Sequence, residues 1–498
     1  MKLQPDNTPL ERTEATLLAA AEVARLFEIR NTQSSLEAAK QELAQTQAEL
    51  RQLKGKLPGL RIDRQLRRVP RAVARRAKRR LKGPPKPSNL KGAKQTPSPV
   101  TTNVAGSVLA WSGSPAGGQP TLLVVCHAYP MDGTTYGGQP IARRVPFYIA
   151  AGYRVVIYVA DERGRRHGGM DELGARIVVG PIAELSTTAM KYGATHLAVH
   201  SPTPEVWSGV SGIAEVLPTA VWIHGFEARN WRLLSFDFSA SEIVSRAKRL
   251  DEVNHKRREL LLTLFSRTDI EKVFVSQYMR NIAEDFVGKP ALNGSVIHNV
   301  IDPGVFPFET KDPELRKNIV SVRSFERRNY GTDLATLTIA TLKHEPWFDQ
   351  LQIRVIGDGR HHEEDVRPLL GLPNVTIEPR ILPTNELRAA LSTSGLSLLP
   401  TRWDSQGMMM GESMMAGLVP ITNAVAAIPE FVDESSGIIL ASEDFEGMAS
   451  AVVRMFERPD EFVELSRAAH ERVLRQCGPD ATVSREIELF SRMRQVAQ

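Results

Sequence analysis

Residues 396–432, LSLLPTRWDSQGMMMGESMMAGLVPITNAVAAIPEFV, decide the fold that we expect for this chain. The run from Leu396 to Leu399 is short, apolar and followed by proline, which predicts a strand buried on both faces. A turn follows, then a Met-rich helix from about Met409 to Gly417, and the apolar run from Val419 to Thr422 predicts the next strand. The segment is therefore typical of an α/β sheet.

Two acidic residues follow the first of these strands. Asp404 lies in the turn at the carboxyl end of the strand, and Glu412 lies eight residues later in the opening turns of the helix. Ligands of open α/β sheets bind outside that end of the strands, so these carboxylates are candidates for contacts with a sugar and with a ribose or diphosphate. Taken singly, each also has a structural explanation, because the helix dipole alone stabilises an acid in a first turn.

The spacing of the whole segment resembles the donor-binding signature of glycosyltransferase family 4. It reads D-x-x-G-M-x-x-x-E-S-M-x-A-G and continues through Pro420 to Pro429-Glu430. The family carries Glu-x7-Glu here, so Glu412 matches the second acid. Asp404 stands in place of the first with a side chain that is shorter by one methylene, about 1.5 Å.

This resemblance implies a retaining enzyme of the GT-B fold, an α/β architecture of two Rossmann-like domains that face each other across a cleft. It implies that Asp404 lies at the sugar and Glu412 on the ribose. The loop amides of Gly407, Met408 and Met409, at a helix N-terminus, would stabilise the charge of the departing phosphate.

The composition is that of a globular protein with ordinary hydrophobic content. At 498 residues, with 42% hydrophobic and 24% charged side chains, the chain is long enough for two core-forming domains plus extensions. No run approaches 18 apolar residues, which argues against a membrane span, and the first residues lack the pattern of a signal peptide. Cys126 and Cys477 alone support neither a disulfide framework nor a thiolate metal site, so we expect a cytoplasmic protein.

The net charge of +6 comes from one segment. Residues 61–95 carry fourteen basic and one acidic side chain, whereas residues 1–60 are balanced and the remainder is acidic. Within residues 64–83, apolar residues share one helical face, which predicts a basic amphipathic helix on an anionic membrane surface, the inner face of the plasma membrane. Nucleic acid is a rival, disfavoured because no aromatic residues interleave the charges, and a solvated basic linker is the third interpretation.

A helical extension and a tether are predicted on either side of this segment. Residues 11–57 lack glycine and proline over most of their length, and leucine recurs every seven residues at Leu36, Leu43, Leu50 and Leu57. This short heptad pattern favours a coiled coil and a homodimer, or else a single helix lying on another domain. We assign 1–60 to this extension and 61–110 to the basic helix and a Pro-rich linker.

The first α/β domain is assigned to residues 111–305. A buried strand is predicted at Thr121–Cys126, a helix at Ile141–Ala150 and another strand at Tyr153–Val159. Gly137 and Gly138 lie in the first strand–helix loop, where backbone amides are able to approach a phosphate or sugar. The family resemblance matches this pair to a Gly-rich donor loop.

His224 ends a further predicted strand, Ala220–Ile223. A histidine at a strand end is commonly a structural residue, but the family often places one here that hydrogen-bonds a hydroxyl of the transferred sugar. Other strands are expected at 176–179, 196–199 and 273–276. Residues 295–302 resemble the family segment that joins the two domains.

The second α/β domain is assigned to residues 306–480 and begins with a strand, Asn318–Arg323. In the family a base at the end of this strand and another five residues later clamp the donor diphosphate, so the resemblance implies this role for Arg323 and Arg328. It also places Ile381 and Leu382 where the backbone reads the nucleobase.

The sequence also predicts where two further segments in the C-terminal part of the chain lie. The run His361–Asp365 is expected to be solvated surface rather than a metal site, because consecutive residues point apart. The last helix, in residues 481–498, is expected to pack back on the first domain.

Together these observations predict the transfer of a sugar from a nucleotide-diphosphate sugar to a glycan or lipid-linked acceptor. The family resemblance also implies a role in bacterial surface polysaccharide synthesis. No metal, cofactor or nucleic acid is expected to take part. The predicted catalytic residues are Asp404, Glu412 and His224. Two other classes stay open: a glycoside hydrolase, which also uses paired carboxylates, and a non-catalytic scaffold.

Overall fold

The computed structural model describes residues 118–130, 137–163, 168–170 and 174–493. The predicted coiled coil at 11–57, the basic segment 64–83 and the tether after it lie outside the described residues. The described residues belong to one compact unit. No helix among them is long and apolar enough to cross a membrane.

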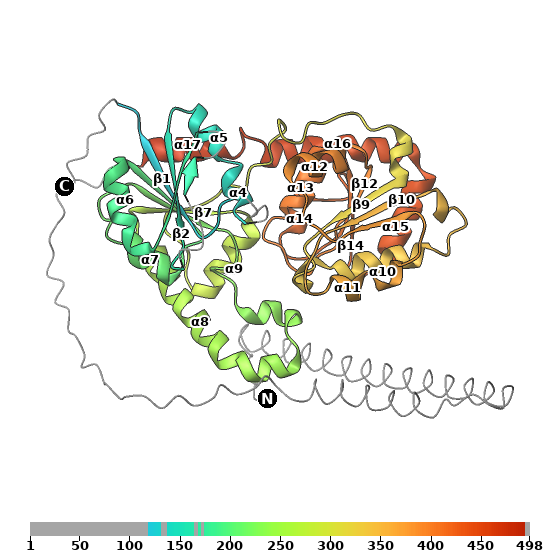
Figure 1. Cartoon of the computed structure of the whole chain (residues 1–498), viewed down its shortest axis with the longest axis horizontal. Coiled ribbons are helices and arrows are strands. Elements are labelled where there is room, and N and C mark those ends of the chain that lie inside the picture. The colour runs from blue at the N-terminus through green and yellow to red at the C-terminus, as the bar shows by residue number, and fades with distance from the viewer. Residues whose placement is uncertain (1–117, 131–136, 164–167, 171–173, 494–498) are drawn as a thin grey trace, which may run out of the picture. The chain divides into compact units, whose positions relative to one another are not determined.

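The first half of the described chain forms an eight-stranded sheet in the order β3-β4-β2-β1-β5-β6-β7-β8 (Figure 1). Neighbouring strands are parallel except β3 and β4, which are antiparallel. The central strand β1 is buried along its whole length, because helices cover both faces of the sheet. The strands are β1 Thr121–Cys126, β2 Arg154–Ala160, β3 Gly169–Met170, β4 Arg176–Gly180, β5 His196–His200, β6 Thr219–Ile223, β7 Ile270–Phe274 and β8 Gly294–Val296.

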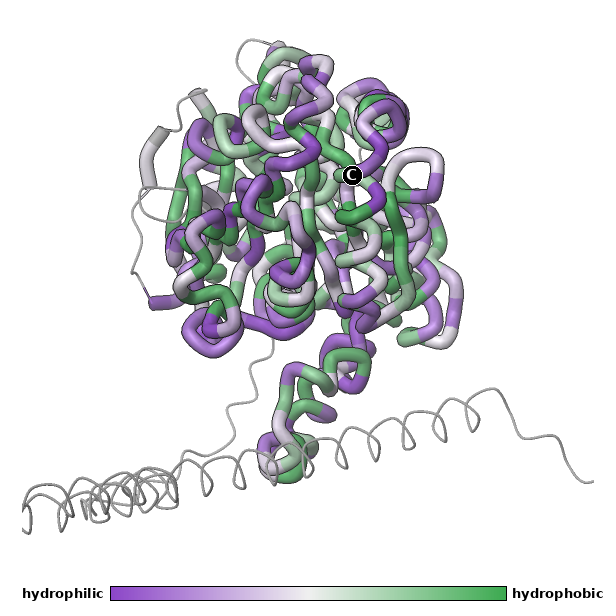
Figure 2. The backbone as a smooth tube through the Cα atoms, turned by 90° about the vertical axis from the view of Figure 1, so that its right-hand side faces the viewer, coloured by the Kyte–Doolittle hydropathy of each residue, from purple (hydrophilic) through white to green (hydrophobic). Residues whose placement is uncertain are grey.

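The helices of this half differ from expectation in several places. The predicted helix 141–150 is two short helices, and a helix of 27 residues, α8, was not predicted although Ser239 and Glu242 form a capping box at its start. The N-terminal part of α8 projects from the rest of the described chain (Figures 1 and 2). The helices are α4 Gln139–Ala142, α5 Val145–Ala150, α6 Leu185–Tyr192, α7 Pro204–Val210, α8 Ala240–Ser266 and α9 Gln277–Val287.

The second half forms a six-stranded sheet, all parallel, in the order β11-β10-β9-β12-β13-β14. The segment quoted first folds as predicted, into a strand, a Met-rich helix and a strand. The strands are β9 Asn318–Val322, β10 Gln352–Ile356, β11 Val375–Glu378, β12 Leu396–Leu398, β13 Val419–Asn423 and β14 Ile438–Leu440. The helices are α10 Thr332–Leu342, α11 His362–Asp365, α12 Thr384–Ser392, α13 Met408–Met415, α14 Ile428–Phe431, α15 Phe445–Glu457, α16 Pro459–Cys477 and α17 Val483–Arg492.

Alternation along the strands divides each half into two hydrophobic cores. In β1, Leu123 and Val125 belong to the core on one face of the sheet, whereas Leu122 and Val124 belong to the core on the other. In Figure 2 hydrophobic stretches gather inside the described chain and hydrophilic ones run along its outer turns. A sheet buried on both faces leaves only its edges and strand ends available for ligands.

The last helix, α17, packs on the first half rather than on the second. Phe490 joins a core of the first sheet, and the carboxylate of Glu486 is completely buried there. That carboxylate accepts hydrogen bonds from Arg144 Nε at 3.0 Å, Tyr148 Oη at 2.6 Å and Trp222 Nε1 at 3.0 Å. A paired and hydrogen-bonded charge is tolerated in a core, so this contact anchors α17.

Candidate functional site

A cavity of about 670 Å³ lies between the two halves and is lined by residues of both. On the first side it is lined by residues that follow β1, β5 and β6, and on the second by residues that follow β9, β10 and β12. These are the carboxyl ends of parallel strands in both sheets, where a ligand site is expected. The two faces of the predicted cleft are therefore present.

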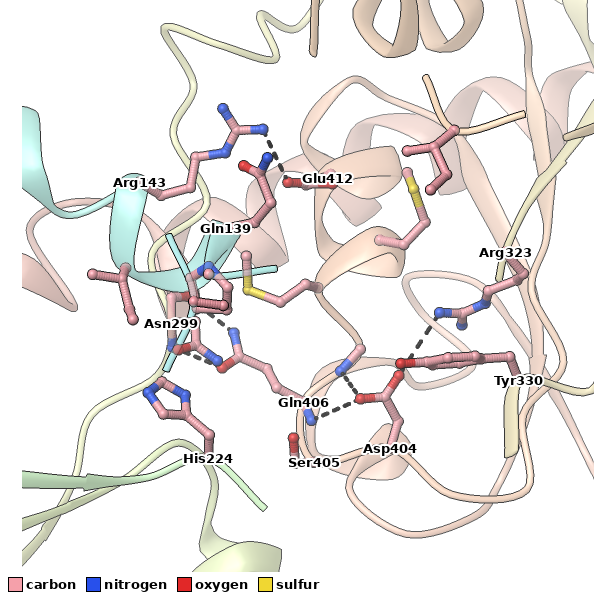
Figure 3. A pocket seen from close by; sticks show the side chains of 18 of the residues that line it. Gln139, Arg143, His224, Asn299, Arg323, Tyr330, Asp404, Ser405, Gln406 and Glu412 are labelled. Atoms are coloured by element: carbon pink, nitrogen blue, oxygen red, sulfur yellow. Dashed lines mark hydrogen bonds and ion pairs between the residues drawn. The ribbon is translucent and has the colours of Figure 1, made fainter. Parts of the chain in front are cut away.

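Asp404 lines this cavity, but its carboxylate is held largely by its own loop (Figure 3). Oδ1 accepts hydrogen bonds from the backbone N–H of Gln406 at 3.3 Å and of Gly407 at 2.9 Å, and Oδ2 lies 3.7 Å from Arg323 Nη1. A side chain one methylene longer would have to bend away to make the same local contacts. The shorter acid thus shapes the turn before α13.

Arg323 is the buried cation of the cavity wall, 5% exposed. Its Nε and Nη2 are buried and have no hydrogen-bond partner among the described residues, and the guanidinium lies 5.5 Å from the ring centre of Tyr330. A buried, unpartnered donor costs free energy unless a ligand accepts from it. The two nitrogens therefore mark a place for an anionic group.

Glu412 also lines the cavity and is buried. Burial raises the pKa of its carboxyl, and the charge of Arg143 opposes that rise. Arg143 follows α4 in the first half, and its Nη2 lies 3.4 Å from Glu412 Oε1 (Figure 3). The ion pair joins the two walls of the cavity.

The start of α13 supplies the backbone donors of the site. Gly407, at φ +79°, precedes the helix, and no side chain caps it. Gly407, Met408 and Met409 all line the cavity. The first N–H groups of a helix have no partner within it, so this end of α13 presents hydrogen-bond donors and a partial positive charge.

Only one of the two adjacent glycines of the first half lines the cavity. Gly138 lines the cavity at φ +81°, and a Cβ there would lie 2.3 Å from the Ala128 carbonyl oxygen. Gly137 does not line it, and a Cβ there would lie 2.9 Å from the Cβ of Ala128. Both glycines are thus explained by close packing on the neighbouring loop. This packing places Gly138 at the cavity.

Three other predicted residues reach the cavity. His224 lines it beside His200, and burial, reinforced by the charge of Arg144, lowers the pKa of His224 to about 3. Ile381 and Leu382 line its second side, beyond β11. His224 is therefore a neutral imidazole at ordinary pH.

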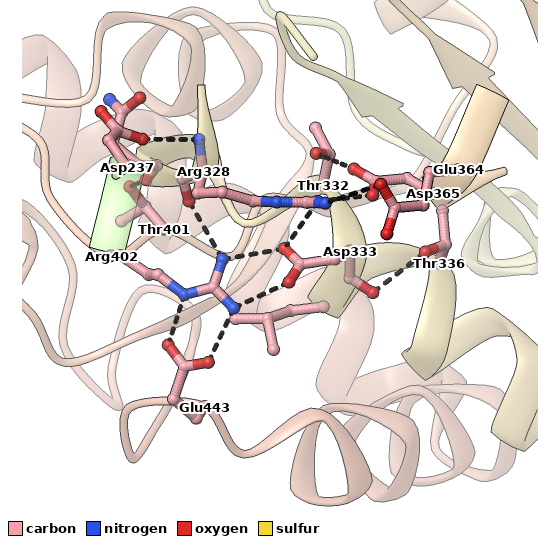
Figure 4. Close-up of polar contacts among 12 residues, drawn as sticks. Asp237, Arg328, Thr332, Asp333, Thr336, Glu364, Asp365, Thr401, Arg402 and Glu443 are labelled. Carbon is pink, nitrogen blue, oxygen red and sulfur yellow. Dashed lines mark hydrogen bonds and ion pairs between the residues drawn. The ribbon is translucent and has the colours of Figure 1, made fainter. Parts of the chain in front are cut away.

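Arg328 is not among the residues that line the cavity. Figure 4 shows it in polar contact with Asp365 instead. Its Nη1 donates to Asp365 Oδ1 at 2.5 Å, and Thr332 Oγ1 donates to Asp365 Oδ2 at 2.5 Å. The structure therefore places Arg328 apart from Arg323, because a buried carboxylate holds its guanidinium outside the cavity. The expectation of solvated surface is likewise wrong for Asp365, whose side chain is 2% exposed.

The residue from this loop that does reach the cavity is Tyr330. It is held by the left-handed turn at Gly331, φ +57°, and burial raises the pKa of its hydroxyl. The sequence contains a signal for this residue, because the glycine of Tyr330-Gly331, after the strand that ends near Arg323, predicts a turn at the ligand edge of the sheet.

Other contacts of the site join residues far apart in the chain. The side-chain amide of Gln406 accepts from the backbone N–H of Asn299 at 2.7 Å and donates to its carbonyl at 2.9 Å. This pair ties the loop before α13 to the segment that joins the halves. No sequence pattern signals it.

Comparison with known families agrees with this geometry. A family model described as Glycosyl transferases group 1 matches residues 316–458, which contain Arg323, Asp404 and Glu412. This part of the chain is a glycosyltransferase group 1 domain. The match to this family model confirms the glycosyltransferase prediction. A search among curated proteins finds no match.

Solved structures show the same arrangement of two Rossmann-like halves. A sucrose-phosphate synthase from Thermosynechococcus elongatus is 16% identical, with a TM-score of 0.60 over 75% of this chain and 99% of that one. The lipopolysaccharide glycosyltransferase WaaG is 13% identical, with a TM-score of 0.57 over 74% and 100%. HepE of Anabaena, solved with UDP-glucose, is 12% identical, with a TM-score of 0.54 over 74% and 99%. The GT-B fold is confirmed.

Among the described residues, no group of three or more His, Cys, Asp or Glu side chains is placed to hold a metal ion.

Proposed function

We propose that the chain transfers a sugar from a nucleotide-diphosphate sugar to a glycan or lipid-linked acceptor in surface polysaccharide synthesis. The observation that carries this proposal is Arg323, a buried arginine whose Nε and Nη2 have no protein partner in the described chain and which lines a cavity between two Rossmann-like halves. A diphosphate offers oxygen acceptors to both nitrogens.

The donor is assigned mainly to the second half. Arg323 and the backbone amides at the start of α13 would bind the diphosphate, and Ile381 and Leu382 would lie along the base. Glu412 would accept from the ribose hydroxyls, a contact that requires Arg143 to share or release the carboxylate. Asp404 would act by holding the loop and Arg323 in place.

The sugar is assigned to the space between the halves. His224 would hydrogen-bond one of its hydroxyls, and Gly138 would leave room for its approach. Negative charge grows on the leaving diphosphate as the glycosidic bond breaks, and the fixed donors of Arg323 and α13 stabilise it without a bound cation. We therefore propose a metal-independent reaction, with retention of anomeric configuration.

The experiment is a panel of UDP-, GDP-, ADP- and dTDP-sugars incubated with the full chain, followed by release of the nucleoside diphosphate. UDP-glucose is the first candidate, because HepE was solved with it. Slow hydrolysis of one donor, together with a rise of the melting temperature with the matching diphosphate, supports the proposal. If no nucleotide binds and the chain instead cleaves glycosides, the hydrolase is correct.

A scaffold without activity is tested in cells. Glu412→Ala removes the buried carboxylate that faces Arg143, and we expect it to reduce the surface glycan that the wild-type chain supports. A glycan that is unchanged by Glu412→Ala, with normal protein abundance, would favour the scaffold.

We further propose that residues 64–83 bind an anionic membrane surface and that residues 11–57 form a homodimer, with the protein peripheral on the cytoplasmic side. The support is the sequence alone: a basic amphipathic pattern and a short heptad repeat. Co-sedimentation of the full chain with anionic and neutral vesicles at low and high salt tests the first. Binding that ignores lipid charge would refute it. Sedimentation equilibrium tests the second.

A further inference from the structure

Three histidines lie at the ends of neighbouring strands on the first wall of the cavity. His127 follows β1, His200 ends β5 and His224 follows β6, and these strands are adjacent in the sheet. All three line the cavity, and burial lowers the pKa of each imidazole. This wall therefore presents neutral rings, which suit hydroxyl groups rather than charged ones.

Two of these rings are in direct contact. His200 Nδ1 lies 2.9 Å from His224 Nε2, with the ring planes 27° apart. His200 is 1% exposed and is stacked on Trp222, with ring centres 4.6 Å apart. Because both rings are neutral, one nitrogen of the contact carries the proton and the other accepts it. The position of this proton determines the tautomer of both histidines.

The surroundings of His200 decide between the two arrangements. Its other nitrogen, Nε2, is buried without a hydrogen-bond partner among the described residues. Burial, reinforced by the charges of His224 and Arg144, lowers the pKa of His200, so the ring is neutral and carries one proton. A buried N–H group without a partner is rarer in proteins than a buried acceptor without one, so the unpartnered Nε2 fits a lone pair better than an N–H. The proton of His200 therefore belongs on Nδ1.

The consequence reaches His224. If His200 Nδ1 donates to His224 Nε2, the single proton of the neutral His224 ring must be on Nδ1. No hydrogen bond between described residues uses this Nδ1, and the side chain lines the cavity, as do Gln406 and Asp404 (Figure 3). The ring thus has an N–H donor to offer a substrate.

We propose that His200 is a positioning residue, which donates a hydrogen bond to His224 and so fixes the tautomer in which His224 donates Nδ1–H to a hydroxyl of the substrate sugar. The inference rests on the proposed function for the identity of the ligand, but the tautomer itself is a property of the protein alone. This tautomer requires a substrate sugar that places a hydroxyl oxygen, acting as hydrogen-bond acceptor, at His224.

The first measurement is the nitrogen chemical shifts of the histidine rings in the full chain, labelled with ¹⁵N-histidine at pH 7.5. Signals are assigned with His200→Asn and His224→Gln. We expect a protonated Nδ1 and an unprotonated Nε2 for His224, and a protonated Nδ1 for His200. A protonated Nε2 on His224 in the wild-type chain overturns the proposal.

The second measurement compares two replacements of His200. His200→Asn keeps an N–H donor close to the position of Nδ1, whereas His200→Phe keeps a ring on Trp222 and removes the donor. We expect His200→Phe to disturb the tautomer of His224 and to lower kcat/KM by about three- to tenfold, the contribution of one hydrogen bond, and His200→Asn to stay within about twofold of wild type. His255→Gln, exposed on α8, is the control for substitution as such.

Equal losses in the Phe and Asn variants, with the His224 signals unchanged, would show a packing role and overturn the proposal. If the wild-type chain releases nucleoside diphosphate from no nucleotide sugar, the proposed function fails instead. The ring signals still decide the tautomer in that case, so the two failures are distinguishable.

Discussion

Replacing Arg323 by methionine tests whether the cavity binds a diphosphate. The methionine keeps much of the length of the side chain and removes the guanidinium, whose Nε and Nη2 are buried without a partner among the described residues. It also leaves Asp404 without the cation 3.7 Å away, although the amides of Gln406 and Gly407 still hold one carboxylate oxygen. We therefore expect the loop to keep its conformation and the anion site to lose its main donor.

The expected size of the effect follows from the number of donors. A hydrogen bond to a charged group contributes about 1.5–3 kcal/mol, and two parallel bonds to one diphosphate share part of that free energy. A loss of about 3 kcal/mol corresponds to an increase of about 100-fold in Kd. Arg323→Lys, which keeps the charge but not the planar pair of donors, should lose about tenfold.

The assay is isothermal titration of the full chain with the nucleoside diphosphate that the donor panel identifies and with the corresponding nucleoside. Arg323→Met should weaken the diphosphate strongly and the nucleoside little, because we assign the base to Ile381 and Leu382 and not to Arg323. An unchanged Kd for the diphosphate would refute the assignment.

Arg328→Met is the matched control. Arg328 is the same type of residue from the same loop, but it pairs with the buried Asp365 outside the cavity (Figure 4). We expect its diphosphate Kd to stay within about twofold of wild type, and its free energy of unfolding to fall by about 3 kcal/mol, since a buried carboxylate loses its charged partner. If Arg328→Met weakens the diphosphate as much as Arg323→Met does, the sequence-based clamp of two arginines is correct and the structural interpretation is not.

Three further outcomes are expected. Arg144→Met leaves the carboxylate of Glu486 buried without its cation, so urea denaturation should show a loss of about 3–5 kcal/mol, and a loss below 1 kcal/mol would contradict the anchoring of α17. Gly138→Ala brings a Cβ to 2.3 Å from the Ala128 carbonyl oxygen at a positive φ; a melting temperature equal to that of the wild-type chain would be inconsistent with this packing, because such strain costs about 1–3 kcal/mol. The pKa of His224 is lowered from 6.5 to about 3, so below pH 6.5 the unfolded chain binds a proton that the folded chain does not. The free energy of unfolding should therefore fall by about 1–2 kcal/mol from pH 7 to pH 5. His224→Asn should lose this part of the pH dependence, and a pH profile identical to that of the wild-type chain would disprove the role of His224.

Local sequence patterns were sufficient to predict the two α/β halves and most of their strands. β1 and β13 are mostly apolar and buried along their whole length, which is typical of strands that helices cover on both faces of the sheet. It also located the acids and Arg323 at the ends of strands, because the order of strand, turn and helix is local. The 27-residue helix α8 was not predicted, because its sequence is too polar to show a clear apolar stripe.

Which side chains meet depends on the packing of the folded chain. Arg323 and Arg328 are equivalent as sequence letters, but one is buried at the cavity and the other is held by Asp365, 37 residues later. In the same way, Arg143 meets Glu412 and His200 meets His224 through the folding of separate strands and helices. A buried charged side chain is stable only where an oppositely charged partner lies close to it. Tertiary packing brings such partners together from distant parts of the chain, and no local sequence pattern encodes this.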